Sequence, residues 1–287
     1  MMDSKDYYVL ITGVSGQLGY DINIELQNRN IKTLAVSSKD LDLTNENMVK
    51  ELFAKNAFTH VIHCAAYTKV DLAEDEKDIV NDVNVNGTKY LAYECEKLNI
   101  PLMFFSTDYV FEGVGCKPYK VYDQQNPKGQ YAISKYNAEK IVEKINKFFI
   151  IRISWVFGMN GNNFVKTMLK LSESKTELNI VCDQVGSPTY TKDLSKLACD
   201  IIFTKEYGIY HATNEGYVSW SDFAREIFKL INKDIKVNDV STEEYGAKAP
   251  RPKNSRLDKS KLLNKGFYLL PTWQDALYRY LKEIGRI

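Results

Sequence analysis

The sequence has few cysteines and none of the spacings that bind metal or form redox pairs. The five cysteines among 287 residues are scattered, and no C-x-x-C pair occurs. An odd number without such spacing argues against a disulfide framework. We therefore expect reduced thiols, mostly packed in the core. His60 and His63 precede Cys64, but they stand in a run typical of a buried strand, so zinc is not predicted there.

Long apolar runs and a dominant charge are also missing. No apolar run reaches the ~18 residues that cross a bilayer. Met1–Tyr8 lacks the basic and apolar regions of a secretion signal. The formal net charge is +1, which gives no bulk electrostatic reason to expect nucleic acid or a membrane as partner. A cytoplasmic globular enzyme is the class that fits.

Short apolar runs alternate with amphipathic stretches in the first half of the chain. Alternating strands and helices predict βαβ units, and continuous apolar strands predict a parallel sheet covered on both faces. The fold class is therefore α/β, with a doubly wound, Rossmann-type, mostly parallel sheet. We expect strands at 7–12, 33–37, 60–65, 101–106 and 148–154, and helices at 16–27, 45–55 (N-capped by Thr44), 73–98 (one helix or two) and 131–146.

The second half is less regular and contains no linker or repeat. Helical periodicity occurs at 163–171, 190–203 and 219–231, and a Pro- and Lys-rich loop covers 247–254. We predict a dinucleotide-binding domain over 1–155, with 188–206 packing back onto it. Residues 156–187 and 207–287 are expected to form a smaller, interwoven C-terminal substrate lobe. This lobe would close over the strand ends, where open parallel sheets bind ligands.

A glycine-rich turn follows the first strand and opens the first helix. Gly13 permits a tight turn, Gly16 lets the backbone approach a pyrophosphate, and Gly19 allows close packing of the helix. The free N–H groups of the helix then face the phosphates. The spacing is G-x-x-G-x-x-G rather than G-x-G-x-x-G, and glycines alone would fit a structural turn. The strand–turn–helix context favours a dinucleotide cofactor.

The second strand ends in Ser37-Ser38-Lys39, without the carboxylate that selects NAD. Hydroxyls and an ammonium tolerate a 2′-phosphate better than a carboxylate does. This favours NADPH and leaves NADH open, although Lys39 also fits an ordinary solvated loop. Asp42 with Leu43 would flank the adenine edge, whereas Asp40 is expected to face water.

Tyr131 and Lys135 stand four residues apart on a predicted helix and so share a face. A nearby ammonium can lower the pKa of a phenol from ~10 by about 1–3 units, which makes it a better proton donor. The lysine can also hold the nicotinamide ribose. Such a pair also arises by chance as two exposed residues. The hydroxyls of Ser106-Thr107-Asp108, at the ligand end of the fourth strand, favour a site that hydrogen-bonds a carbonyl group.

With these motifs the chain resembles the extended short-chain dehydrogenase/reductases, and within them the dTDP-4-dehydrorhamnose reductases. The resemblance covers nearly the whole chain and includes 65–71 (AAYTKVD), 106–111 (STDYVF), 152–157 (RISWVF), 161–164 (GNNF), 183–189 (DQVGSPT) and 251–255 (RPKNS). It implies reduction of dTDP-4-dehydro-L-rhamnose to dTDP-L-rhamnose by NAD(P)H, a step toward cell-surface polysaccharide. The nucleotide sugar is then the expected partner, with a homodimer as a further option.

The resemblance also implies roles for individual residues. The catalytic trio would be Thr107, Tyr131 and Lys135, with Tyr131 and Lys135 also touching the cofactor. The cofactor would be lined by Gly13, Gly16, Gln17, Leu18, Gly19, Ser37, Asp42, Leu43, Ala65, Ala66, Tyr67 and Thr68. The substrate would meet Thr107, Asp108, Trp155 and Arg251, the last at its diphosphate. Trp155 is also compatible with a core residue between the two lobes, and Arg251 is also compatible with a solvated charge on a loop.

Two further residues matter for what the resemblance implies. Asn84 is similar to a family asparagine that supports the active-site backbone, and it also fits the cap of a kink. Some relatives use magnesium at a dimer interface. Asp21 is the one candidate ligand that the sequence offers, so we predict no metal site.

Two alternatives stay open. A nucleotide-sugar epimerase of the same superfamily would retain its cofactor and show no net redox change. A dehydratase fits less well, because such enzymes usually place an acid pair beside the strand-end threonine, and only Asp108 follows Thr107. The other alternative is a non-catalytic regulatory subunit, resembling the partner of methionine adenosyltransferase.

Overall fold

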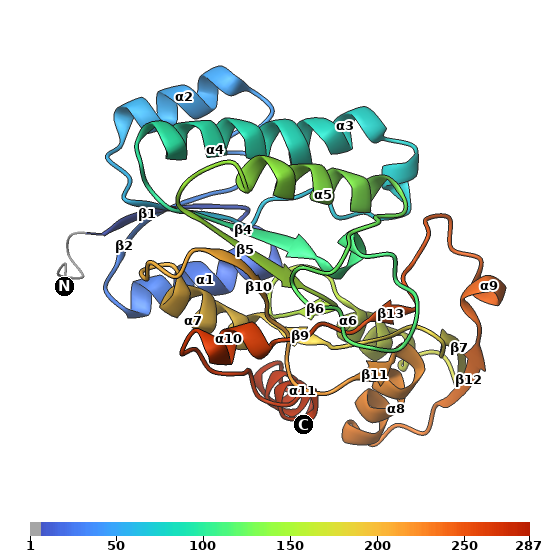
Figure 1. Cartoon of the computed structure of the whole chain (residues 1–287). Coiled ribbons are helices and arrows are strands. Elements are labelled where there is room, and N and C mark those ends of the chain that lie inside the picture. Colours follow the sequence, from blue (N-terminus) through green and yellow to red (C-terminus); the bar gives the residue numbers. More distant parts are fainter. Residues whose placement is uncertain (1–6) are drawn as a thin grey trace.

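The computed structural model describes residues 7–287, so residues 1–6 of the Met1–Tyr8 segment lie outside the described part. Its centre is a six-stranded sheet in the order β10-β5-β4-β3-β1-β2 (Figure 1). Every neighbouring pair in this sheet is parallel. This confirms the doubly wound α/β fold. The strands are β1 (Tyr8–Thr12), β2 (Lys32–Val36), β3 (His60–His63), β4 (Leu102–Thr107), β5 (Phe148–Ile153) and β10 (Gly208–His211).

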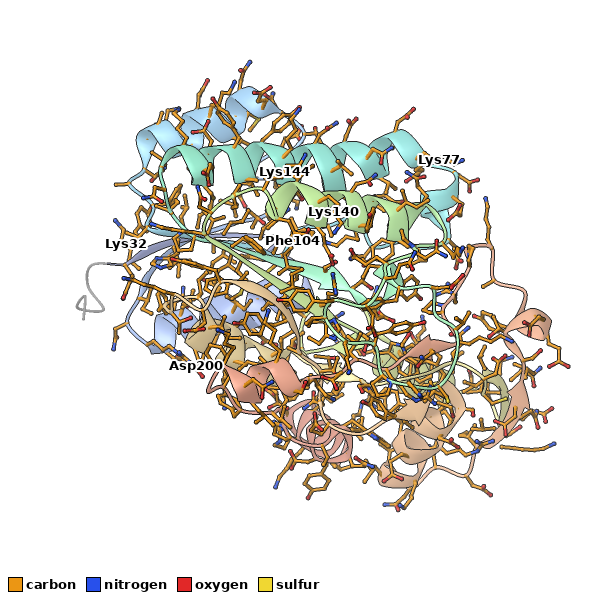
Figure 2. The ribbon with its side chains drawn as sticks, in the orientation of Figure 1. Lys32, Lys77, Phe104, Lys140, Lys144 and Asp200 are labelled. Atoms are coloured by element: carbon orange, nitrogen blue, oxygen red, sulfur yellow. The ribbon has the colours of Figure 1, made fainter. Side chains whose placement is uncertain are left out.

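Helices cover both faces of the sheet (Figure 1). One face carries α2 (Glu46–Lys55), α3 (Lys77–Asn81), α4 (Gly87–Lys97) and α5 (Gln130–Val142), and the other carries α1 (Gln17–Asn28), α7 (Thr191–Ile201) and α10 (Ser260–Asn264). Each face has its own apolar core. Figure 2 shows Phe104 of β4 inside the layer toward α5, with Lys32, Lys77 and Asp200 at the periphery. The apolar strands are thus buried on both sides.

Two local predictions differ from the structure. The N-cap of α2 is Asn45, whose side chain accepts hydrogen bonds from the backbone of Asn47 and Met48. Thr44 was the wrong choice because it lies one residue too early, and its hydroxyl donates to Asp42 instead (2.7 Å). The stretch predicted at 73–98 contains the 3₁₀ turn η2 (Leu72–Glu74), α3, the π-helical turn η3 (Asp82–Asn86) and α4.

The rest of the chain forms a second lobe with a separate apolar core. It contains β6 (Val156–Phe157), α6 (Phe164–Leu171), β7 (Glu177–Val181), β8 (Val185–Gly186), β9 (Thr189–Tyr190), β11 (Val218–Ser219), α8 (Trp220–Leu230), β12 (Lys236–Val240), α9 (Thr242–Tyr245), β13 (Asn254–Ser255) and α11 (Trp273–Glu283). These strands form three small sheets, β11-β8-β13, β12-β7 and β6-β9.

Three later segments return to the large sheet, namely α7, β10 and α10. Helix α7 packs beside α1 on one face, through Leu194 and Leu197. Strand β10 extends the sheet beyond β5, although the sequence analysis had placed 207–287 in the second lobe. Its four residues are too few to give a strand signal, and pairing with β5 decides their position. Within 7–287, no helix has the length and apolar character needed to span a membrane.

Candidate active site

A cavity of about 620 Å³ opens at the carboxyl ends of the parallel strands. Its lining follows the edge of the sheet, with Ser37 after β2, Gly13 after β1, Ala65 after β3, Thr107 at β4 and Trp155 after β5. Gly161, Asn162 and Trp220 close it from the second lobe. The cavity therefore lies at the edge where open parallel sheets bind ligands.

The glycine turn packs tightly against the backbone that follows β3 and against helix α1. Gly13 has a φ of +75°, and a Cβ there would lie 2.5 Å from the backbone nitrogen of Ala65. A Cβ on Gly19 would lie 2.5 Å from the Gly13 carbonyl oxygen, so Gly19 packs against the turn and not into the cavity. Helix α1 begins after Gly16 without a side-chain cap, and its first N–H groups are available to an anion.

Substitution of Gly13 tests this shape. Gly13→Ala should lose about 1–2 kcal/mol of unfolding free energy from the positive φ. The clash with Ala65 adds about 1–3 kcal/mol. Gly115→Ala is the matched control, because Gly115 has a φ of +77° and no described atom lies within 4 Å of its Cβ position. Urea unfolding of both variants separates backbone strain from the clash. Equal losses of unfolding free energy in the two variants would show that the Ala65 backbone does not restrict the side chain at position 13.

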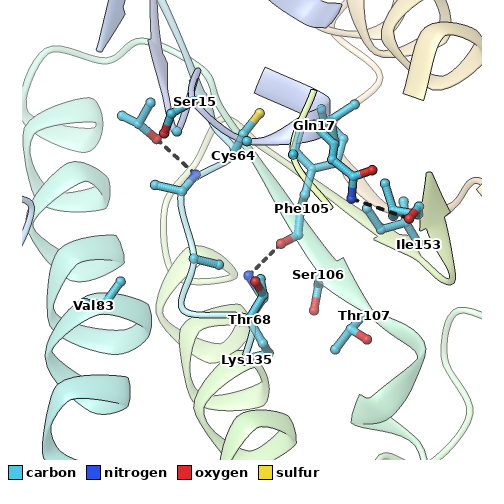
Figure 3. Close-up of a pocket in the computed structure, with 18 of the residues that line it drawn as sticks. Ser15, Gln17, Cys64, Thr68, Val83, Phe105, Ser106, Thr107, Lys135 and Ile153 are labelled. Carbon is cyan, nitrogen blue, oxygen red and sulfur yellow. Dashed lines mark hydrogen bonds between the residues drawn. The ribbon is translucent and has the colours of Figure 1, made fainter. Parts of the chain in front are cut away.

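The catalytic residues predicted from the sequence meet in this cavity. Thr107, Tyr131 and Lys135 all line it. Figure 3 shows Lys135 reaching from α5 to the backbone carbonyl oxygen of Phe105, beside Ser106 and Thr107; the Nζ–O distance is 2.7 Å. The Thr107 hydroxyl donates to Asp108 Oδ1 at 2.8 Å. A phenol, a hydroxyl and an ammonium thus share one wall.

The pKa of Tyr131 differs from the expectation. Burial and the nearby Asp108 and Tyr109 raise the pKa of the Tyr131 phenol, and only its hydrogen bond with Thr107 opposes them. The predicted lowering by Lys135 is wrong for this state, because the ammonium is directed at the Phe105 carbonyl. Burial also lowers the pKa of Lys135 to about 7, against opposing effects of Glu139 and Cys64. Tyr131 therefore keeps its proton at neutral pH and is a donor.

Near this wall the buried Ser106 Oγ has no protein partner among residues 7–287, and the buried Asp108 carboxyl has only the hydroxyls of Thr107 and Ser255 beside it. Buried polar atoms of this kind are normally satisfied, so they indicate a ligand in the cavity. Burial also raises the pKa of Asp108 from 3.8 to about 6. The folded protein consequently holds this proton more tightly than the unfolded chain.

This shift predicts a pH-dependent gain in stability for Asp108→Asn. Because the folded-state pKa is raised, the stability that protonated Asp108 contributes is lost as pH rises through about 6. Raising the pH from about 4 to 7 should therefore increase the unfolding free energy of the variant, relative to that of the wild type, by roughly 3 kcal/mol at most. Urea unfolding across this pH range checks it. A difference that does not change with pH would refute the assignment.

Asn84 holds the wall that follows β3. It is buried in the π-helical turn η3, where its Oδ1 accepts from the Tyr67 N–H at 2.7 Å. Its Nδ2 donates to the Tyr67 carbonyl (3.2 Å) and to Ser134 Oγ (2.9 Å). The Tyr67 side chain turns away from the cavity to Glu76. Asn84 thereby positions Ala65, Ala66 and Thr68, which do line the cavity.

Several residues lie differently from their predicted roles. Arg251 is not among the described residues that line the cavity, and it pairs with Asp71 at 2.7 Å. His63 is a core residue between Thr12 and Thr88. In the described part of the chain, no group of three or more His, Cys, Asp or Glu side chains is arranged to hold a metal ion.

The second lobe contributes lining residues that the sequence patterns do not predict. Trp220 stacks on Trp155 with ring centroids 3.6 Å apart, and both line the cavity. Trp155 has a φ of +51°, which is uncommon for a large side chain. Gly161 and Asn162 belong to the 161–164 motif, but nothing in the sequence indicated that they line the cavity. The other lining residues to which the sequence patterns gave no role include Ser15, Val70, Val83 and Tyr109.

A doubly wound sheet with a glycine turn after β1, a strand-end threonine and a Tyr/Lys pair on α5 defines an extended short-chain dehydrogenase/reductase. Within this class, the family model described as "RmlD substrate binding domain" matches residues 7–286. The chain therefore belongs to that family.

Known proteins of similar sequence and structure support this membership. The spore coat polysaccharide biosynthesis protein SpsK of Bacillus subtilis is 39% identical over 277 residues, covering 96% of this chain and 97% of the relative. A dTDP-4-dehydrorhamnose reductase of Aggregatibacter actinomycetemcomitans is 39% identical, covering 94% and 96%. The crystal structure of dTDP-4-dehydrorhamnose reductase from Bacillus anthracis, in complex with NADP, has a TM-score of 0.94 and 41% identity, covering 96% and 99%.

Proposed function

We propose that this protein is an NAD(P)H-dependent reductase that converts dTDP-4-dehydro-L-rhamnose to dTDP-L-rhamnose, a precursor of cell-surface polysaccharide. The observation that carries the proposal is that Thr107, Tyr131 and Lys135 share one cavity with the glycine turn. The name of the Aggregatibacter relative and the NADP in the Bacillus anthracis structure support the same activity.

The proposal extends to the organisation of the protein. Residues 1–155 with 188–206 would bind the dinucleotide, and 156–187 with 207–287 would bind the substrate. The exceptions are β10 and α10, which pack with the large sheet, and β9, which pairs with β6 of the second lobe. The enzyme would act in the cytoplasm on a nucleotide sugar, alone or as a homodimer, without nucleic acid or membrane partners.

The residues of the cavity fit a nicotinamide dinucleotide. Gly13, Gly16 and Gln17 line the cavity at the start of α1, where a diphosphate would lie, and Ser37, Asp42 and Leu43 line the end toward β2. Ser106 Oγ, which has no protein partner within the described residues, and the Asp108 carboxyl line the other end, where they suit a sugar. When bound, NADPH or NADH supplies the hydride for the keto carbon.

The protein's own residues handle the oxygen of the keto group. Thr107 and Tyr131 would hydrogen-bond this oxygen, where negative charge grows as the carbonyl is reduced. Tyr131 would then donate its proton to the oxygen. Lys135 would stabilise the resulting tyrosinate once its ammonium leaves the Phe105 carbonyl, and a proton through water or ribose hydroxyls would restore Tyr131.

A single assay tests the proposed function. The protein is mixed with dTDP-4-dehydro-L-rhamnose, made in situ with a 3,5-epimerase, and with NADPH or NADH. We expect loss of reduced-nicotinamide absorbance equal to the dTDP-L-rhamnose formed. Conversion of a sugar nucleotide without net cofactor oxidation would instead identify an epimerase. No turnover of any dTDP- or UDP-4-keto sugar, together with tight binding to another enzyme, would identify a regulatory subunit.

A further inference from the structure

An internal carboxylate occupies the hydrogen-bond donors at the end of β2. The Ser37 N–H donates to Asp40 Oδ2 at 2.8 Å, and the Ser37 hydroxyl donates to the same oxygen at 2.6 Å. The Lys39 N–H in turn donates to Ser37 Oγ at 3.2 Å. These bonds to Ser37 hold the pKa of the exposed Asp40 below its ordinary value, so the carboxylate is ionised at neutral pH.

This arrangement lies where a dinucleotide places its adenosine ribose. In doubly wound sheets, the residues after the second strand contact the 2′ position of that ribose. Ser37 and Ser38 line the cavity, whereas Asp40 is not among the lining residues that the structure describes. Asp40 therefore acts on the cavity through Ser37.

A 2′-phosphate needs N–H and O–H donors, and it carries negative charge of its own. At Ser37 both donors already serve an anion, and the positive charge of Lys39 also acts on that anion. A neutral 2′-hydroxyl does not need the Ser37 donors, because it can itself donate a hydrogen bond to a lone pair of Ser37 Oγ.

We propose that Asp40 is a positioning residue that sets the cofactor preference of this enzyme by standing in for a 2′-phosphate at Ser37. NADPH can bind, but its 2′-phosphate must displace the Asp40 carboxylate from Ser37 or bind against its negative charge. NADH, which has no 2′-phosphate, binds without this penalty. This inference rests on the proposed function, since it assumes a nicotinamide dinucleotide in the cavity.

The substitution Asp40→Asn isolates the charge. The amide oxygen of asparagine can still accept from Ser37, so the turn keeps its hydrogen bonds while the negative charge disappears. Glu46→Gln is the matched control. It changes the net charge equally at an exposed position on α2, where Glu46 pairs with Lys50 (2.7 Å) and lies outside the cavity lining.

The test measures binding without turnover. Calorimetry would give the affinities of 5′-AMP and adenosine 2′,5′-bisphosphate for the wild type, Asp40→Asn and Glu46→Gln. We expect Asp40→Asn to favour the bisphosphate over 5′-AMP by roughly 5- to 100-fold more than the wild type does at low salt. High salt should narrow this gap, since the carboxylate is exposed. The NADPH-to-NADH ratio of kcat/KM should shift in the same direction, and Glu46→Gln should leave both ratios unchanged.

Each other outcome has a definite meaning. An unchanged ligand ratio, or equal weakening of both ligands, would overturn the inference, because Asp40 would then only shape the turn. In that case the proposed reductase activity stands. If the folded wild type binds neither adenosine ligand and no dinucleotide, the cofactor proposal fails and this inference fails with it.

Discussion

Tyr131→Phe should reduce turnover of the 4-keto sugar nucleotide by about 10²–10⁴-fold, because the variant has no proton to give to the carbonyl oxygen. Steady-state kinetics with NADPH measures this loss. Cofactor affinity should stay near that of the wild type, since the phenyl ring keeps its volume in the wall shared with Tyr109, whose ring lies 5.8 Å away. A calorimetric titration with NADP⁺ checks that part.

The matched control for this loss is Tyr136→Phe. Tyr136 is on the same helix α5, but it packs toward Phe111 and Leu257 and is not among the described cavity-lining residues. Its substitution should leave turnover within about twofold of the wild type, as is usual for a change away from the reacting groups. Wild-type turnover in Tyr131→Phe, or equal losses in the two variants, would remove Tyr131 from the mechanism.

The sequence could predict those parts of the cavity that follow the strands of the large sheet. The carboxyl ends of parallel strands share one edge, so Gly13, Thr107 and Trp155 had to come close once the strand pattern was recognised. Helical spacing placed Tyr131 and Lys135 on one face, and the hydroxyls after the fourth strand distinguished this pair from a chance occurrence. The prediction of a doubly wound α/β fold is also confirmed. It rested on continuous apolar strands that alternate with helices, and both features can be read along the chain.

The parts that could not be predicted depend on tertiary packing. Trp220 and Asn162 reach the cavity from a lobe whose sheets contain strands of only two to five residues, too short for a periodic signal. The direction of the Tyr131 pKa shift depends on the burial of the phenol and on the nearby Asp108 and Tyr109, which only the packed structure reveals. Arg251 shows the same limit, because its pairing with Asp71 joins residues far apart in the chain.

The second large effect concerns stability and arises one helical turn after Lys135. Glu139 and Arg152 form a fully buried ion pair, with side chains 0% and 1% exposed and an Nη2–Oε2 distance of 2.7 Å. Arg152 Nε also donates to Glu139 Oε1 at 2.9 Å. Its Nη1 donates to the Val121 carbonyl at 2.8 Å and lies 3.3 Å from His211 Nε2. The pair thus joins α5, β5 and β10 under the catalytic wall.

Glu139→Gln should lower the unfolding free energy by about 3–5 kcal/mol, because it leaves the Arg152 guanidinium buried without a counter-charge. Glu143→Gln on the same helix is the control. Glu143 pairs with Lys140 at 2.9 Å, with side chains 28% and 39% exposed, and the loss there should be about 0–1 kcal/mol. Urea unfolding of both variants measures the difference.

A double variant, Glu139→Leu/Arg152→Met, removes both charges together. Its loss of unfolding free energy should be smaller than the sum of the losses in the two single variants. Similar losses for Glu139→Gln and Glu143→Gln would show that this buried pair does not hold the three elements together.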